Sequence, residues 1–242
     1  IRLVIVCDGL EHFESNDASG GLAWLPPQLP PNVKVILSGR SSVGTAAAAE
    51  RGWPVLTLPP LDALQQERLA TQYLAGYGKS LDSEHLQSLL SSPRTRVPRF
   101  LVAVLEELRV AGTHELLGEL LAGYLRCEDL SALYSQVLTR LERDFETVRS
   151  GLIGDVLALL ASASEGLAEA EILELLTQSE EPLPAALWSP IALALDGYFG
   201  RREARLYIAD PELRSVVVHR YLASETAREE RLQAIAAFFA SA

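Results

Sequence analysis

The chain opens with an almost unbroken apolar run that ends in an acid, Asp8, followed by Gly9. Short runs of this kind, rich in β-branched residues, are typical of buried parallel strands with helices on both faces. A second run at residues 33–38 follows after about 20 residues, a separation that fits a crossover between parallel strands. A third short strand is expected at residues 55–58. These runs predict an α/β fold for the first quarter of the chain.

The end of the first strand is the first candidate site. In open α/β sheets, ligands bind beyond the carboxyl ends of the strands, where Asp8 stands and Glu11 follows. In a nucleoside triphosphatase, a strand-end acid holds Mg²⁺ directly or through its water, and a second acid can orient the attacking water. Arg40 follows the second run, and a guanidinium is suited to a γ-phosphate. The alternative for Asp8 is an ordinary Asp-Gly turn at the end of the strand, and the alternative for Arg40 is a solvated side chain in a loop.

Composition limits the classes of protein. The net charge of −11 argues against a nonspecific nucleic-acid binder and against an anionic membrane surface as partner. No apolar run approaches the roughly 18 residues of a membrane span, and we expect no signal peptide. Cys7 and Cys127 are expected to be reduced, buried thiols of a cytoplasmic protein. Because the chain lacks methionine and begins directly in a strand, we expect it to be a segment of a longer protein.

From residue 61 to about residue 180 the apolar periodicity is helical. Helices are expected after Asp62, at residues 81–90 with Asp82 or Ser83 as N-cap, and at 100–111, 114–125 and 130–149. Pro98 belongs to the opening turn of the third of these, where proline is tolerated. The chain therefore continues as an all-α region.

The sequence Gly78-Lys79-Ser80 looks like the end of a phosphate-binding P-loop. That motif requires a glycine where this chain has Tyr73, and it follows a strand rather than a helix. We therefore reject the P-loop, and we expect Gly78 to end the preceding helix instead.

Residues 151–242 have the order helix, turn, helix, helix, hairpin, which is typical of a winged helix. Winged helices commonly read DNA with their second or third helix. The candidate helix at residues 168–177 carries Glu169, Glu171 and Glu174, which phosphates would repel. A protein-packing role is therefore favoured. The basic cluster in the hairpin is interpreted as a solvated wing tip and consists of Arg201, Arg202 and Arg205.

In combination, these stretches resemble the NACHT group of STAND-class P-loop NTPases, in particular the NACHT modules of telomerase-associated and nephrocystin-like proteins. Residues 3–11 look like a Walker B strand with its extra acid. Further matches are residues 24–26, 29–38, 58–61, 73–74, 77–79, 98–101, 105–109 and 141–144. The resemblance implies the C-terminal half of an αβ NTPase core at residues 1–60, a helical subdomain at 61–150 and a winged-helix domain at 151–242.

The resemblance also implies roles for single residues. Asp8 would bind Mg²⁺, Glu11 would lie near the attacking water, and Arg40 would be the sensor at the γ-phosphate. Pro98 would pack on the adenine of ATP or ADP. Asp210 stands where many relatives carry a histidine that contacts the β-phosphate of ADP, and His219 lies elsewhere on that helix, so the chain departs from the family pattern there. A Walker A loop is expected upstream of residue 1.

The function implied by the resemblance is an ATP/ADP-dependent conformational and oligomerisation switch in signal transduction. Its partners would be other protomers and attached repeat or effector domains. ATP hydrolysis would belong to the full-length protein, and the segment alone is expected to be inactive. Two alternatives remain: an inactive NTPase-derived scaffold for protein assembly, and a winged-helix regulator that binds nucleic acid.

Overall fold

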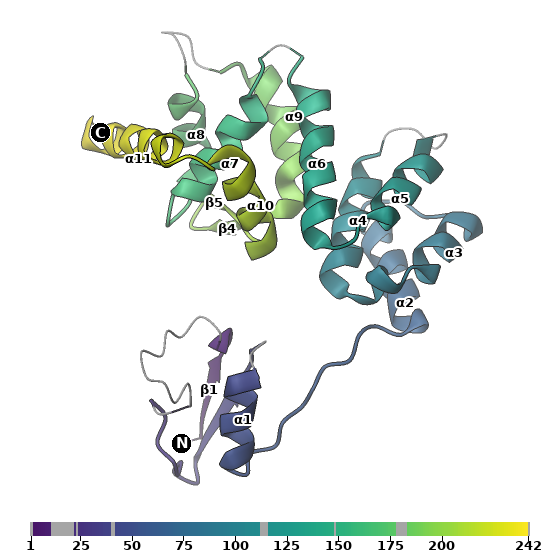
Figure 1. Ribbon diagram of the computed structural model, residues 1–242, viewed down its shortest axis with the longest axis vertical. Coiled ribbons are helices and arrows are strands. Elements are labelled where there is room, and N and C mark those ends of the chain that lie inside the picture. The colour runs from purple at the N-terminus through teal and green to yellow at the C-terminus, as the bar shows by residue number, and fades with distance from the viewer. Residues whose placement is uncertain are drawn as a thin grey trace. The chain divides into compact units, whose positions relative to one another are not determined.

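The computed structural model describes residues 2–10, 22, 24–39, 42–111, 116–147, 149–177 and 183–241. The chain divides into two compact units, Ile1–Pro59 and Pro60–Ala242 (Figure 1). Among the described helices, none is long and apolar enough to cross a membrane. The fold is mixed α/β and mostly helical, with a small parallel sheet in the first unit.

The first unit contains the predicted pair of strands. β1 (Leu3–Cys7) and β2 (Val33–Leu37) pair in parallel, with Leu3 opposite Val33 and Cys7 opposite Leu37. Helix α1 (Ser42–Glu50) follows β2. The prediction of two parallel strands is confirmed, and because the strands run in the same direction their carboxyl ends lie at the same edge of the sheet.

Two details of the first unit differ from the expectation. The strands are not buried, since Val4 is 56% and Val6 is 67% exposed. Residues 55–58 form no strand, and Leu56 is 85% exposed. A parallel strand is buried only where further strands and helices cover it, and the sheet of the described residues has two strands. An apolar β-branched segment becomes a strand only when another strand pairs with it, which composition does not reveal.

The second unit begins with a layer of helices. They are α2 (Ala63–Ala75), α3 (Ser83–Ser91), the 3₁₀ turn η2 (Pro93–Arg96), α4 (Pro98–Val110), α5 (Leu117–Arg126) and α6 (Leu130–Phe145). The Asp62 side chain accepts a hydrogen bond from the Gln65 N–H at 2.8 Å, and that of Asp82 from the His85 N–H at 2.9 Å. The predicted starts of α2 and α3 are thus confirmed, whereas α6 ends before the expected residue 149. The start expected at residue 114 lies outside the described structure, because residues 112–115 are not described.

The geometry around Gly78 confirms that this stretch is not a P-loop. Helix α2 precedes it, and Gly78 has a φ of +67°, a left-handed conformation that suits glycine after a helix. The Lys79 N–H donates to the Leu74 carbonyl at 2.9 Å, which closes the helix end. The Lys79 ammonium donates to the Ala111 carbonyl at 2.9 Å, so this lysine links α2 to the end of α4.

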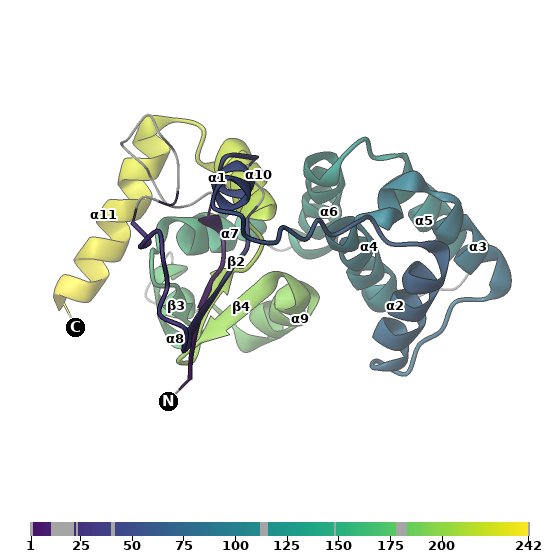
Figure 2. The same cartoon turned by 90° about the horizontal axis from the view of Figure 1, so that it is seen from below.

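The remaining elements combine helices with a small antiparallel sheet (Figures 1 and 2). In order they are α7 (Leu152–Ser162), β3 (Leu167–Ala168), α8 (Glu169–Leu175), α9 (Ala185–Leu195), η4 (Asp196–Tyr198), β4 (Phe199–Arg202), β5 (Arg205–Ile208), α10 (Pro211–Tyr221) and α11 (Glu225–Ser241). The strand order is β3-β5-β4. Helix α9 starts earlier than the predicted Ser189-Pro190 and includes Pro190 in its interior.

One apolar core runs through the second unit. Helix α7 is buried on nearly all sides and packs on α6, α10, α11 and β5. A helix that is apolar all round is a core helix rather than a surface helix. Helix α4 is buried from Phe100 to Leu108 except at Val102, and it contacts α2, α5 and α6. This burial includes two carboxylates, Glu106 and Glu107, which therefore need partners.

Candidate functional site

The first candidate site lies at the carboxyl ends of β1 and β2. Asp8 follows β1 and is exposed, and its carboxylate accepts a hydrogen bond from the hydroxyl of Ser38, which follows β2. Glu11 and Arg40, the other two residues predicted for this site, lie outside the described residues. The structure thus adds Ser38 to this site. Because the two runs pair in parallel, the residues that follow them, Asp8 and Ser38, lie side by side.

The residues at this edge fit a magnesium ion. Mg²⁺ prefers oxygen ligands and is usually held by one or two carboxylates together with substrate phosphates and water. Asp8 and Ser38 supply a carboxylate and a hydroxyl. Among the described residues, no group of three or more His, Cys, Asp or Glu side chains could hold a metal ion by itself. A carboxylate and a hydroxyl leave positions around Mg²⁺ for phosphate oxygens and water.

A second candidate site is a cavity of about 380 Å³ inside the second unit. Its walls come from α4, α6, η4 and the start of α10. The two residues predicted to bind the nucleotide in this unit, Pro98 and Asp210, both line it. Pro98 is exposed in the first turn of α4, and Asp210 is the N-cap of α10. The fold thus brings together two positions that are far apart in sequence.

The Asp210 carboxylate is bound by other groups of the same chain. Its Oδ1 accepts hydrogen bonds from the N–H groups of Glu212 at 2.8 Å and Leu213 at 3.2 Å. The Arg99 guanidinium binds the same carboxylate with two nitrogens, its Nε lying 2.9 Å from Oδ2. Burial opposes ionisation of Asp210, but the bonds from Arg99 and from the helix terminus outweigh it and lower its pKa. Asp210 therefore stays ionised and links α4 to α10.

Sequence reasoning missed Arg99. It lies in the first turn of α4, where the positive end of the helix dipole disfavours a cation. Such a local conflict indicates that the side chain has a partner elsewhere, although it does not name Asp210. Tyr134 of α6 lies beside the pair, and burial, followed by the charge of Asp210, raises the pKa of its hydroxyl.

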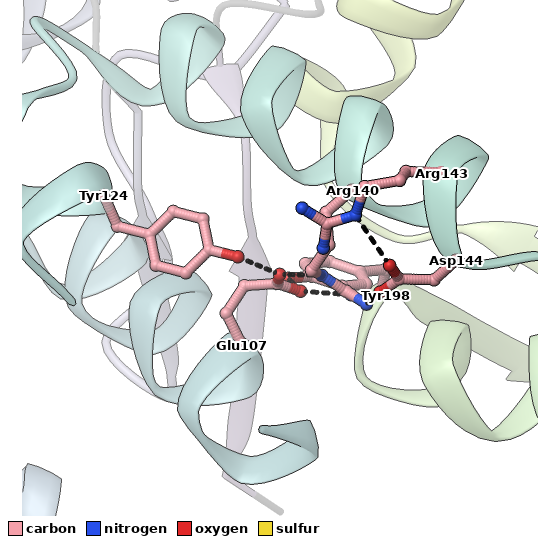
Figure 3. Close-up of polar contacts among 6 residues, drawn as sticks. All are labelled: Glu107, Tyr124, Arg140, Arg143, Asp144 and Tyr198. Carbon is pink, nitrogen blue, oxygen red and sulfur yellow. Dashed lines mark hydrogen bonds and ion pairs between the residues drawn. The ribbon is translucent and has the colours of Figure 1, made fainter. Parts of the chain in front are cut away.

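A buried ionic network centred on Glu107 includes Tyr198, which also lines this cavity. Figure 3 shows the residues of the network. The fully buried Glu107 carboxylate accepts hydrogen bonds from Tyr124 at 2.6 Å, from Tyr198 at 2.9 Å, and from Arg140 Nε at 2.5 Å and Nη2 at 2.9 Å. Burial raises the pKa of both tyrosines, and the negative charge of Glu107 adds to this effect. Burial opposes the charged form of Arg140, but Glu107 outweighs it and raises the arginine pKa. The network joins α4, α5, α6 and η4 at one point.

Further polar contacts join residues 61–150 to residues 151–242. Glu142 of α6 accepts hydrogen bonds from Arg220 Nε at 2.9 Å and from the Tyr221 hydroxyl at 2.5 Å. Arg149 donates to Asp155 at 2.9 Å and to the Leu176 carbonyl at 2.7 Å. Glu142 lies in the last turn of α6 and Arg149 follows that helix, so these contacts fasten the C-terminal end of α6 to the elements that follow.

The predicted basic wing tip is partly wrong. Arg201 forms an exposed ion pair with Asp196 at 3.0 Å, as expected for a solvated side chain. Arg205 instead binds the Glu171 carboxylate at 2.9 and 3.1 Å and the Gly166 carbonyl at 3.1 Å. The two residues belong to β5 and α8, so this arginine holds the small sheet against a helix rather than extending into solvent.

Comparisons with known proteins give distant similarities. No protein-family model matches the chain. It is 28% identical to NACHT domain- and WD repeat-containing protein 1 of Homo sapiens over 98% of this chain and 16% of that protein. It is 26% identical to a TPR repeat-containing protein of Dictyostelium discoideum over 91% of this chain and 13% of that protein. It is also 26% identical to telomerase protein component 1 of Mus musculus, over 90% of this chain and 9% of that protein.

The chain thus spans less than a fifth of the length of these curated relatives. Among solved structures, a Walker-type ATPase of Pyrococcus abyssi is similar with a TM-score of 0.39 and 15% identity, over 89% of this chain and 63% of that one.

Proposed function

We propose that this chain is the part of a STAND-type NTPase of the NACHT group that runs from the Walker B strand through a winged helix. Its function in the whole protein is an ATP/ADP-dependent conformational and oligomerisation switch. The observation that carries this proposal is the similarity to a NACHT- and WD-repeat protein along 98% of the chain. The position of Asp8 at the carboxyl end of a parallel strand supports it, because ligands bind at that edge.

The proposal gives each predicted site residue a role. Asp8 holds Mg²⁺, which would neutralise charge on the phosphates during transfer to water. Glu11 orients the attacking water, and Arg40 senses the γ-phosphate. Pro98 offers an apolar surface to the adenine. Asp210 lies at the same cavity, where its ion pair ties the helical region to the elements that follow.

The order of the C-terminal elements supports a winged helix. Helix α7, strand β3, helices α8 and α9, and the hairpin β4–β5 follow one another, and the three strands form one antiparallel sheet. In α8, Glu171 binds Arg205, and Glu169 accepts a hydrogen bond from the Trp188 indole at 2.6 Å. These acids serve packing inside the domain, which favours a role in protein contacts over nucleic-acid reading.

The experiment is Mg²⁺-dependent ATP turnover by the full-length protein and its variants Asp8→Asn and Glu11→Gln. We expect each variant to lose about 10²-fold in turnover, because each removes a charge that acts on the reacting phosphate or water. Glu84→Gln, an exposed acid on α3, is the matched control and should turn over ATP like the parent. Parental turnover in both site variants would show that the assigned roles are wrong.

The Arg99–Asp210 pair favours one second candidate, a scaffold that has lost hydrolysis. In this candidate, protein side chains alone hold α4 and α10 together, and no nucleotide is needed for the arrangement. The partners would again be other protomers and attached repeat domains. Full-length protein that neither binds nor hydrolyses ATP, yet keeps its oligomeric state in the absence of nucleotide, would favour the scaffold over the switch.

A further inference from the structure

Ser38 is fixed beside Asp8 by three contacts. Its hydroxyl donates to Oδ1 of Asp8. Its backbone N–H donates to the Cys7 carbonyl at 3.0 Å, and its own carbonyl accepts from the Leu10 N–H at 2.9 Å. Between these bonds the chain turns at Gly9, whose φ of +75° is a left-handed conformation that suits glycine. The turn after β1 therefore bends around Ser38, and two of the three contacts do not involve the serine side chain.

The Asp8 carboxylate can still be reached from solvent. Asp8 and Ser38 are both exposed, and the serine hydroxyl binds one of the two carboxylate oxygens. The other oxygen, Oδ2, has no hydrogen-bond partner among the described residues. An ionised carboxylate offers about four lone-pair positions, of which one hydroxyl takes one. Oδ2 is therefore open to an ion or to its water, at the sheet edge where ligands bind.

A hydrogen bond to one carboxylate oxygen restricts the other before any ion binds. An exposed aspartate rotates freely, and the rotational entropy that it loses on binding an ion weakens the binding. The Ser38 hydroxyl removes part of that freedom in advance. A hydroxyl is neutral, so it leaves the negative charge of Asp8 available to attract Mg²⁺, whereas a lysine or arginine in its place would compete with the ion. Removing such a neighbour of a metal ligand typically weakens metal affinity about 10–100-fold.

We propose that Ser38 is a positioning residue for magnesium: its hydroxyl holds Oδ1 of Asp8 so that Oδ2 faces the Mg²⁺ of a bound nucleotide. The inference rests on the proposed function, because it requires a magnesium nucleotide at this edge of the sheet. Ser38 acts through Asp8 and does not contact the nucleotide itself. It therefore sets how much Mg²⁺ adds to nucleotide affinity, and it leaves the affinity for the metal-free nucleotide unchanged.

The test is calorimetric titration of the full-length protein with the non-hydrolysable analogue β,γ-imido-ATP, once in EDTA and once in excess Mg²⁺. The ratio of the two affinities measures the contribution of the metal without any catalysis. We expect Ser38→Ala to lower this ratio about tenfold or more and to keep the parental affinity in EDTA. Ser38→Thr retains a hydroxyl and should retain the parental ratio. Ser88→Ala, whose hydroxyl donates to the Glu84 carbonyl of its own helix at 3.0 Å, is the matched control.

The outcomes separate this inference from the proposed function. If Mg²⁺ strengthens binding to the parent and to Ser38→Ala by the same ratio, the role of Ser38 is refuted and the proposed function stands. Equal weakening of Ser38→Ala with and without Mg²⁺ also refutes it, because a residue that acts through the metal ligand spares the metal-free nucleotide. A parent whose affinity does not depend on Mg²⁺ overturns the proposed function and this inference together.

The alanine variant should fold, because both main-chain bonds of Ser38 remain in it. If it does not fold, Ser38→Cys decides, since a thiol occupies the same position but donates only weakly. The ratio should then fall in the cysteine variant as well, and a parental ratio there would refute the assignment.

Discussion

Arg99 and Asp210 lie 111 positions apart in the chain, yet Nε of Arg99 donates to Oδ2 of Asp210 at 2.9 Å. The carboxylate at the same time caps α10 through the Glu212 and Leu213 N–H groups. One side chain thus closes a helix terminus and holds the start of α4 beside it. The cap and the ion pair are separable in experiment because asparagine also caps helices but carries no charge.

The first prediction concerns this residue. Asp210→Ala should lower the free energy of unfolding by about 2–3 kcal/mol, since it removes both the cap and the partner of Arg99. Asp210→Asn should lose less, because the cap is kept. Urea denaturation measures both, with Asp196→Ala as the control, since the exposed Asp196–Arg201 pair contributes about 0–1 kcal/mol. Equal losses for Ala and Asn would mean that the cap contributes nothing.

The second prediction concerns the Glu107 network. Glu107→Gln should destabilise the fold by about 3–5 kcal/mol, because it removes the buried anionic partner of Arg140 and leaves the arginine only the partly exposed Asp144, at 3.2 Å, among its described ion pairs. Replacing both residues by methionine should cost less than the single change, since no unpaired charge remains. Chemical denaturation of the single and the double variant measures the two losses in the free energy of unfolding. Arg143→Ala, whose side chain is 70% exposed, should stay within about 0.5 kcal/mol of the parent.

The third prediction is steric. Gly197→Ala should destabilise the protein by about 1–3 kcal/mol, because the new methyl group collides with the Glu106 carboxylate and pushes it off its position beside Arg109. Gly118→Ala in α5 is the control. There the added Cβ meets only the end of the His85 ring at 3.2 Å, and alanine gains helix propensity of about 1 kcal/mol. Thermal unfolding of both variants checks the contrast, and a Gly197→Ala protein as stable as the parent would contradict it.

The fourth prediction concerns acid. Burial opposes ionisation of both Asp210 and Glu142, but their arginine partners outweigh it and lower each pKa below its ordinary value of 3.8 or 4.5. A lowered pKa in the folded state gives stability that is fully present above the unfolded pKa and is lost as the pH falls through the folded one. The parent should therefore lose stability faster than the Asp210→Asn, Glu142→Gln double variant below about pH 4.5.

Urea midpoints measured between neutral and acid pH test this difference. Glu106 acts in the opposite direction, because burial raises its pKa, but it is present in both proteins and cancels in the comparison. If the urea midpoints of the parent and the double variant change with pH in the same way, the ionisation of neither carboxylate contributes to the pH dependence of stability.

Sequence reasoning succeeded where a local pattern determines the structure. The β-branched runs before Asp8 and Ser38 gave the parallel pair, and Asp62 and Asp82 gave helix starts, because capping needs only neighbouring residues. The prediction of a strand at residues 55–58 was wrong, because an apolar β-branched segment forms a strand only when another strand pairs with it.

The site was predictable only in part for the same reason. Pro98 and Asp210 were chosen through a family resemblance, and their shared cavity depends on packing between α4 and α10. Whether they bind nucleotide stays a prediction, as do the roles of Asp8, Glu11 and Arg40. Glu106 and Glu107 look like the polar face of an amphipathic helix. Glu107 is bound by Tyr198 and Arg140, which periodicity cannot place beside it. Likewise, periodicity cannot place Gly197 against Glu106.

The Glu107 network includes residues on both sides of residue 150, and this limits how short a stably folded fragment of this protein can be. A chain shortened to end near residue 150 would keep Glu107, Tyr124 and Arg140 but would lose the Tyr198 hydroxyl, together with the partners of Arg99 and Glu142. Such a fragment would leave ionised groups facing solvent where neighbours once enclosed them. Protein chemists seeking a minimal soluble piece for crystals should therefore retain the sequence at least through Tyr221.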